Sequence, residues 1–344
     1  RQESMCAVVK GYPIVIRNSD NPQDKWNVPF DAPLFHWHTK KDRQRQLLAY
    51  MQDEYHISKE ELGTGTIREK CWKNILAIET VKQLEKEQRQ ATKEEQNILA
   101  DYVGWGGIAD VFDEKKPQWQ EERERIQTAL TPEEYRSAVG SVLNAHYTQP
   151  VLIKAMYQVL AGLGFTKGRI LEPSCGTGNF FGLLPESMNK STLYGVELDQ
   201  MSAKIAGYLY PEVNIENTGF ERTDYPDGYF DIAVGNVPFG DYRVNDPVYN
   251  RHGFLIHDYF FAKTLDKLRP GGVAAFITTK GTMDKENTKV RQYLFKRAEL
   301  LGAVRLPNTA FKNAGTKVTS DILFLQKREK EIADPELSLI HISE

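Results

Sequence analysis

The sequence predicts an α/β fold, in which a doubly wound, mostly parallel sheet follows a mainly helical N-terminal region. From about residue 145, short apolar runs alternate with longer helix-like patterns, as in parallel sheets whose strands are connected by helices. Residues 41–140 carry helix-start signals instead. The chain has 344 residues, of which 40% are hydrophobic and 26% charged, which suits a globular protein of about two domains.

The composition narrows the possible partners and the compartment. The formal net charge is -3, so any contact with nucleic acid has to come from a local basic patch. Cys6, Cys71 and Cys175 are scattered and form no CxxC pair, so we expect a reducing compartment, no disulfide framework and no metal site. No apolar run approaches the ~20 residues of a membrane helix, and there is no signal peptide. Because the chain begins with Arg1 rather than Met, we expect it to be a piece of a longer protein.

The N-terminal region divides into two predicted parts. Residues 1–40 are rich in Pro and Trp and predict an irregular segment. Residues 41–144 predict a helical domain. Three possible capping boxes support it: Ser58…Glu61, Thr92…Glu95 and Thr131…Glu134, the last with Pro132 at the first helical position.

The α/β domain is expected over residues 145–330. Seven apolar runs predict its strands: Arg169–Leu171, Leu193–Leu198, Val213–Glu216, Phe230–Gly235, Val273–Thr278, Leu301–Leu306 and Ile322–Leu325. Four segments predict its helices: Pro150–Leu163, Gln200–Leu209, Ile256–Leu268 and Lys285–Glu299. Residues 331–344 form a tail. Its last residues break abruptly from the charged run before them, and we interpret them as a cloning or sequence-assembly artefact.

A glycine turn follows the first predicted strand of this domain, at the end of the strand where doubly wound sheets bind their ligands. The segment Ile170–Phe181 reads ILEPSCGTGNFF. Its glycines allow backbone to approach a ligand without a Cβ in the way. It is neither a dinucleotide fingerprint, since position 181 is Phe, nor a phosphate loop, since no Gly-Lys-Ser/Thr follows. Glu172 would repel a pyrophosphate but can hold an ammonium group, which points to a zwitterionic, phosphate-free nucleoside such as S-adenosylmethionine.

A second acidic residue, Glu197, ends the next predicted strand. It follows Gly176 at about the 20-residue offset at which an acidic side chain accepts hydrogen bonds from ribose hydroxyls. Asp199 is expected to cap the helix that begins at Gln200. The alternative is an ordinary βαβ turn with surface acids, and the joint spacing of Glu172, the glycines and Glu197 favours the nucleoside site.

The tetrapeptide Asn236-Val237-Pro238-Phe239 follows the apolar run Phe230–Gly235. It therefore holds a carboxamide and an aromatic ring at the end of a predicted buried strand. This pairing suits a site that grips the amino group of a planar substrate and stacks on its face.

Together these motifs resemble those of the class I S-adenosylmethionine-dependent methyltransferases, specifically the N6-adenine DNA methylases. The tetrapeptide resembles their Asn-Pro-Pro-Tyr/Phe motif, with Val237 in place of the first proline. The order, with cofactor motifs before the catalytic tetrapeptide, is that of the gamma-type and type I modification enzymes. The resemblance covers about residues 145–328. More narrowly, the chain is similar to the methylase region of methyltransferase–helicase fusions carried by phages and conjugative elements.

The resemblance implies a seven-stranded sheet, S-adenosylmethionine as cofactor, and a set of cofactor contacts. Those contacts are Tyr147, Thr148, Glu172, Pro173, Cys175, Gly176, Gly178, Phe180, Glu197 and Phe220. In this family the segment His146–Pro150 contacts the methionine end of the cofactor, and Phe220 would pack on the adenine face. One departure is the run Asn217–Glu221, which lacks the Asp that usually hydrogen-bonds the adenine.

The resemblance also implies catalytic roles for Asn236, Val237, Pro238 and Phe239. The Asn236 side-chain oxygen and the Val237 carbonyl would accept hydrogen bonds from the target amino group, and Phe239 would stack on the base. A duplex base must be flipped out to reach such a site. The carbonyl survives the change from Pro to Val, although the rigidity of proline does not fully survive.

Two other functions remain open, and so does the role of one loop. A protein-glutamine or RNA N-methyltransferase can carry a similar tetrapeptide, and Val237 and the missing Asp would also fit a catalytically silent DNA-binding module. The expected partner is double-stranded DNA with an adenine target, in the cytoplasm of a bacterial or phage-host cell. A downstream helicase or target-recognition region is expected in the longer protein. The loop Tyr242–Phe254, with Arg243, Arg251 and His252, either lines the target pocket or is simply solvated.

Overall fold

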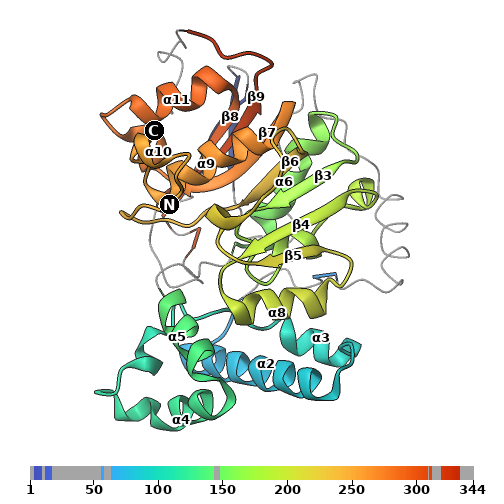
Figure 1. Ribbon diagram of the computed structural model, residues 1–344, viewed down its shortest axis with the longest axis vertical. Helices are drawn as coiled ribbons and strands as arrows, with labels where there is room; N and C mark the ends of the chain where they lie inside the picture. The colour runs from blue at the N-terminus through green and yellow to red at the C-terminus, as the bar shows by residue number, and fades with distance from the viewer. Residues whose placement is uncertain are drawn as a thin grey trace.

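The computed structural model centres on one sheet of nine strands. It describes residues 4–9, 12–17, 56–57, 63–142, 148–308, 310–311 and 319–333. Within these ranges the strand order is β2-β1-β8-β9-β7-β6-β3-β4-β5. Figure 1 shows the sheet above a layer of helices contributed by the first part of the chain.

The seven strands from β3 onward are those predicted from the sequence. They are β3 Arg169–Glu172, β4 Thr192–Glu197, β5 Asn214–Asn217, β6 Phe230–Asn236, β7 Leu268–Thr279, β8 Ala298–Leu306 and β9 Ser320–Lys327. The pairs β3–β4, β4–β5, β3–β6 and β6–β7 are parallel, and β9 runs antiparallel to both of its neighbours. The predicted fold class, a doubly wound and mostly parallel seven-stranded sheet, is therefore confirmed.

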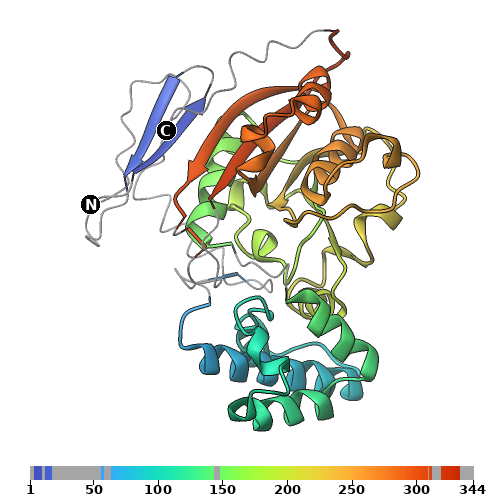
Figure 2. The ribbon, with the colours of Figure 1, turned by 90° about the vertical axis from the view of Figure 1, so that its left-hand side faces the viewer.

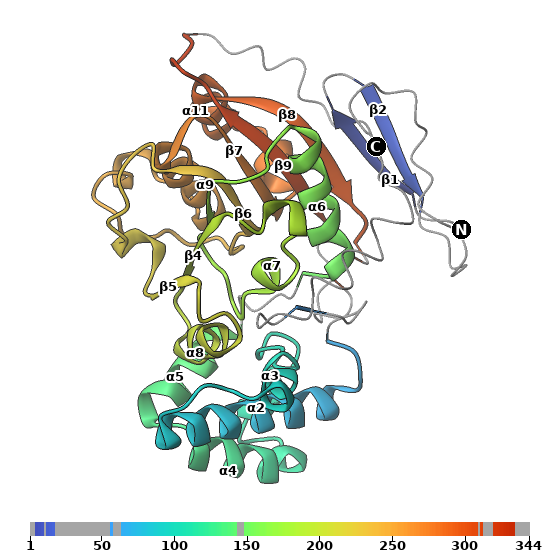
Figure 3. The same ribbon diagram turned by 90° about the vertical axis from the view of Figure 1, so that its right-hand side faces the viewer.

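Helices cover both faces of this sheet, and they bury two hydrophobic clusters. The helices are α6 Pro150–Gly162, α7 Asn179–Gly182, α8 Gln200–Leu209, α9 Ile256–Lys267, α10 Gly281–Asp284 and α11 Lys289–Arg297. Ile170 belongs to the cluster with α6, α7 and α8, whereas its neighbour Leu171 belongs to the cluster with α9 and α11. Figure 3 shows α6 on one side of the sheet and α9 and α11 on the other.

One predicted helix is too long at both ends. The segment Lys285–Glu299 was expected to be helical throughout, but the helix α11 covers only Lys289–Arg297. Ala298 and Glu299 pair with Lys327 and Gln326 of β9, so these two residues belong to the strand β8 and not to the helix. The other three predicted helices are confirmed to within one residue.

The N-terminal segment contains a β-hairpin, which corrects the prediction of an irregular segment over residues 1–40. The strands β1 Ser4–Val9 and β2 Tyr12–Arg17 pair antiparallel, and β1 also pairs antiparallel with β8. This pairing extends the seven-stranded sheet to nine strands. Figure 2 shows the hairpin in blue, beside the end of the sheet.

The helical layer packs against α8. It consists of α2 Ile67–Glu87, α3 Lys93–Leu99, α4 Gln120–Ala129 and α5 Pro132–Ser141. The capping boxes at Thr92 and Thr131 are confirmed, and an unpredicted third one at Thr66 starts α2. The Ser58…Glu61 box lies outside the described residues. Lys204 of α8 pairs with Glu85 at 2.6 Å and with Glu134 at 2.9 Å, which joins the two layers. None of the helices in the described ranges is both long and apolar enough to cross a bilayer.

Candidate functional site

The predicted motifs meet at the carboxyl edge of three adjacent parallel strands, β6, β3 and β4 (Figure 1). The glycine turn leaves β3, Glu197 ends β4, and Asn236 ends β6. The Ser174 hydroxyl donates a hydrogen bond to the Asn236 main-chain oxygen at 3.1 Å. The glycine turn and the tetrapeptide are therefore in direct contact, although 62 positions separate these two residues in the sequence.

The two glycines of the turn have different local roles. Gly176 and Gly178 both have left-handed backbone, with φ of 55° and 81°. A Cβ added at Gly178 would lie 2.7 Å from the Tyr210 ring, so this glycine is required for packing. A Cβ added at Gly176 would meet nothing within 4 Å, so the backbone there borders open space. Gly176 is thus the position at which a ligand can approach the main chain.

Glu197 holds the glycine turn in place. Its Oε2 accepts a hydrogen bond from the Gly176 N–H at 2.7 Å, and its Oε1 accepts one from the Asp199 N–H at 2.7 Å. Burial, and then the charge of Asp199, raises the pKa of Glu197 to about 7. A carboxylate offers about four acceptor positions, so capacity remains for two ribose hydroxyls. The sequence pointed to the ribose contact but not to this second role.

Glu172 is a buried carboxyl group with an unfilled acceptor. Its side chain is 2% exposed, and its Oε2 has no hydrogen-bond partner among the described residues. Burial, and then the charge of Glu197, raises the pKa of Glu172 well above its usual value. A buried ionised carboxyl without a partner is costly. A cationic ligand would supply that partner, so this oxygen and the open space at Gly176 fit an ammonium-bearing nucleoside such as S-adenosylmethionine.

The tetrapeptide is fixed through its second residue. The Val237 N–H donates to the Ile277 carbonyl of β7 at 3.1 Å, and the Val237 side chain is 2% exposed. Proline at this position would have no N–H to donate. The structure therefore uses a hydrogen bond to fix the backbone where the related motif uses a ring. Phe239 is partly exposed and packs against both hydrophobic clusters.

Most of the other predicted cofactor residues are buried in the protein. Thr148, Pro173, Cys175, Phe180 and Phe220 are all buried, and Tyr147 lies outside the described residues. Burial raises the pKa of the Cys175 thiol well above its usual value, which disfavours a nucleophilic thiolate.

The two buried phenylalanines belong to different clusters. Phe180 packs edge-to-face on Tyr157 at 6.2 Å, whereas Phe220, on the turn η4 Phe220–Arg222, lies 5.2 Å from the Phe260 ring. Both rings support the core in the structure, and their contact with a cofactor stays a prediction.

Sequence reasoning missed a buried ion pair next to the site. Lys263 and Asp246 are 4% and 5% exposed, and their Nζ and Oδ2 atoms lie 3.3 Å apart. The Tyr259 hydroxyl donates to the same Oδ2 at 2.8 Å, and Lys263 also donates to the Glu221 carbonyl at 3.2 Å. This group ties the loop after the tetrapeptide to the turn that carries Phe220. The only signal in the sequence is that Tyr259 and Lys263 are one helical turn apart.

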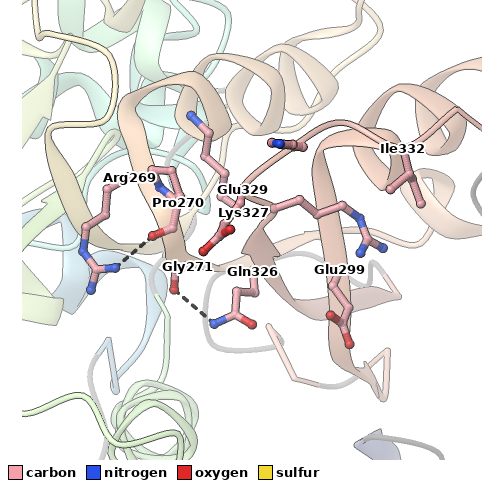
Figure 4. Close-up of a pocket in the computed structure, with 10 residues that line it drawn as sticks. Arg269, Pro270, Gly271, Glu299, Gln326, Lys327, Glu329 and Ile332 are labelled. Atoms are coloured by element: carbon pink, nitrogen blue, oxygen red, sulfur yellow. Dashed lines mark hydrogen bonds between the residues drawn. The ribbon is translucent and has the colours of Figure 1, made fainter.

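A surface cavity lies at the opposite edge of the sheet, where β7 and β8 begin and β9 ends (Figure 4). It is lined by Arg269, Pro270, Gly271, Glu299, Gln326, Lys327, Arg328, Glu329, Lys330 and Ile332. The Arg269 guanidinium already pairs with Asp231 at 2.6 Å, and Gln326 donates to the Gly271 carbonyl. The cavity mixes both signs of charge and takes no part in the site. Among the described residues, no cluster of three or more His, Cys, Asp or Glu side chains could hold a metal ion.

Comparison with known proteins gave matches of three kinds. The N-6 DNA Methylase family matches residues 133–344. The chain is 30% identical over 258 residues to "Defense against restriction protein B" of Escherichia phage P1, covering 73% of this chain and 10% of that protein. It is 30% identical over 112 residues to modification methylase CviBIII of Paramecium bursaria Chlorella virus NC1A, covering 31% of this chain and 30% of that protein. The chain thus spans less than a third of the length of either relative.

A similar solved structure is the type I restriction-modification system methyltransferase subunit from Streptococcus thermophilus. Its sequence identity is 15% and its TM-score 0.44, and the match covers 74% of this chain and 66% of that one.

Proposed function

The chain belongs to the N-6 DNA Methylase family, and from this premise we propose that it transfers a methyl group from S-adenosylmethionine to the N6 amino group of adenine in DNA. The observation that carries the proposal is the contact between Ser174 and Asn236. It puts a turn suited to an ammonium-bearing nucleoside directly beside a motif suited to an amino group.

S-adenosylmethionine is the cofactor of this family, and it supplies a methyl group already activated by its sulfonium. The protein's task is then to bind and orient the reactants. Glu172 would hold the ammonium group, and Glu197 would accept hydrogen bonds from the ribose hydroxyls. Gly176 would let the main chain approach the nucleoside closely.

The target adenine would be held by the tetrapeptide. The Asn236 side-chain oxygen and the Val237 carbonyl would accept the two N–H hydrogens, which orients the nitrogen toward the methyl group. The hydrogen bond from the Val237 N–H to Ile277 supports this role, because it holds the peptide that follows Asn236. Phe239 would stack on the flipped base, a contact worth about 1–3 kcal/mol. None of these roles requires a dedicated general base before methyl transfer.

The form of the DNA substrate, the source of sequence specificity and the cellular location are also part of the proposal. We expect the substrate to be double-stranded DNA and a downstream helicase or target-recognition region to provide sequence specificity. The phage relative is named for defence against restriction, which fits a methyl mark that protects DNA. The cytoplasm of a bacterial or phage-host cell is the expected location.

The experiment that tests the proposal follows a tritiated methyl group. The protein is incubated with labelled S-adenosylmethionine and with duplex DNA, RNA or a release-factor-like protein, and labelled DNA is digested to nucleosides. The expected product is N6-methyladenine from DNA. Label in RNA or in glutamine would instead favour the alternative acceptors.

Two asparagine variants make this test specific to the tetrapeptide. Asn236→Ala should abolish transfer while calorimetry still detects cofactor binding. Asn214→Ala is the matched control, because Asn214 is exposed and starts β5, away from the tetrapeptide. Turnover retained by Asn236→Ala would contradict the proposed role.

A further inference from the structure

The loop between the tetrapeptide and α9 returns to the carboxyl edge of the sheet. The Ile256 N–H, at the start of α9, donates to the Tyr242 carbonyl at 2.9 Å, which closes the base of the loop. In Figure 3 this loop is the gold segment beside α9. The loop begins at Gly240, so it leaves the tetrapeptide directly after Phe239.

The loop is held by buried polar contacts. Asp246 accepts hydrogen bonds from the Tyr259 hydroxyl and from the Val248 N–H, and it pairs with Lys263. The Tyr249 hydroxyl donates to Asp266 of α9 at 2.6 Å. Because these bonds form inside the protein, the loop presents its exposed side chains in a fixed arrangement, which lowers the entropic cost of binding.

Two arginines of this loop have no ion-pair partner among the described residues. Arg243 and Arg251 are exposed, and neither lies within 4.0 Å of a carboxylate in the part of the chain that the structure describes. Other arginines nearby are paired, as Arg297 is with Glu331 at 2.8 Å. The one exposed carboxylate at the base of the loop is Asp241.

The two guanidinium groups flank the same turn. A Cβ on Gly253 would lie 3.5 Å from the Arg243 guanidinium carbon, so Arg243 covers that turn. Arg251 donates from Nε to the His252 ring at 3.2 Å, and His252 stacks on Phe254 with an interplanar angle of 12°. Burial, and then the charges of Arg251 and Arg297, lowers the pKa of His252. The turn therefore carries two guanidinium groups beside the stacked rings of His252 and Phe254.

The geometry points to a DNA-backbone contact, in which Arg243 and Arg251 bind phosphates next to the flipped adenine. This inference rests on the proposed function, from which it takes DNA as the nucleic acid that is bound. A guanidinium matches a phosphate through two parallel hydrogen bonds. Because the whole chain carries a net charge of -3, a local pair of free arginines is the kind of feature that can attract a polyanion.

The test measures how binding to duplex DNA depends on salt. Backbone contacts are independent of sequence, so a fluorescein-labelled duplex of about 20 base pairs serves although the target site is unknown. Each lost phosphate contact should reduce the slope of log K against log salt by about 0.9. Arg243→Gln/Arg251→Gln should therefore flatten the slope by about 1.8 and weaken binding at least about tenfold at low salt.

Two further variants separate the contact from total charge and from folding. Lys167→Gln/Lys190→Gln removes the same charge from exposed positions just before β3 and β4, at the opposite edge of the sheet, and should leave the slope unchanged. Arg243→Lys/Arg251→Lys keeps the charge and should retain most of the slope. S-adenosylmethionine affinity, measured by calorimetry, should be the same for all variants, which shows that each one folds.

The possible outcomes distinguish this inference from the proposed function. If the wild type methylates adenine but the arginine variant keeps its slope, the inference is wrong and the function stands. If no methylation occurs but the arginine variant flattens the slope as expected, the two arginines bind DNA phosphates and the proposed function is wrong. A wild-type protein that shows no salt-dependent affinity for duplex DNA overturns the inference.

Discussion

Glu172→Gln should weaken cofactor binding while leaving the unliganded protein more stable. The substitution keeps the shape of the side chain but removes its charge. Glu172 is 2% exposed, and its Oε2 has no partner among the described residues. The unliganded protein therefore carries a cost that the cofactor's ammonium group would offset. A hydrogen bond to a charged group contributes about 1.5–3 kcal/mol, so the variant should bind S-adenosylmethionine about 10- to 150-fold more weakly.

Without the cofactor, the Glu172→Gln protein should be more stable than the wild type. Glutamine cannot ionise, so it avoids the cost of a buried charge, and relief of about 1 kcal/mol raises the melting temperature of a domain of this size by about 2–4 °C. Burial holds the pKa of Glu172 above its ordinary value of 4.5, so the folded protein keeps this proton to a higher pH than the unfolded chain does. Stability from this group is therefore lost as the pH rises above about 4.5, and the variant should lack that loss.

Cofactor affinity should follow pH in the other direction. The ionised form of Glu172 is the one that pairs with an ammonium group, so affinity should rise with pH until the raised pKa of Glu172 is passed. Calorimetry in buffers of different ionisation enthalpy should detect a proton released on binding below that pKa. The Glu172→Gln protein should bind with a flatter pH profile and without that proton release.

A ligand without the amino-acid part makes the test specific. 5′-Methylthioadenosine keeps the nucleoside but has no ammonium group, so wild type and variant should bind it equally. Equal loss of affinity for both ligands would show that Glu172 shapes the pocket rather than pairing with the ammonium. An unchanged affinity for S-adenosylmethionine would refute the reasoning altogether.

Two further substitutions test how the site is held. Val237→Pro restores the proline of the related motif but removes the N–H that donates to Ile277; it should lower stability by about 1–3 kcal/mol in urea unfolding and slow methyl transfer, and a faster enzyme would show that the hydrogen bond is dispensable. Lys263→Met leaves Asp246 buried without its cation, so it should cost about 3–5 kcal/mol and expose the loop to limited proteolysis. Lys267→Met, one helical turn away, breaks only a pair with exposed Asp227 and should change little.

The strands and the main motifs were predictable because their signals are local. The inner strands of the α/β domain are apolar runs bounded by turn residues, because burial on both faces of a parallel sheet requires such runs. The exception is β5, which lies at the end of the sheet and is largely exposed. Glu172, Gly176 and Asn236 were proposed as site residues because their residue types suit one chemistry at the ends of adjacent strands. Their contact through Ser174 then followed from the strand order.

The features that the sequence did not reveal depend on distant partners. The hairpin β1–β2 adds to β8 through the pairing of Cys6 with Arg305. The helix α11 ends at Arg297 because Ala298 belongs to β8 and pairs with Lys327 of β9. The carboxylate of Asp246 reads as an ordinary loop acid until the fold brings Lys263 against it. In each case a tertiary contact overrides or supplements the local pattern.

The hairpin also decides where the sheet ends. Without β1, the strand β8 would present a row of unsatisfied backbone groups, the kind of surface on which other chains add and aggregate. The new outermost strand, β2, is only six residues long and carries Pro13, which cannot donate to a further strand. A shortened protein that begins at the α/β domain would keep the tetrapeptide and the glycine turn but lose this protection. For crystallisation or biophysics, residues 4–17 are therefore worth retaining for solubility.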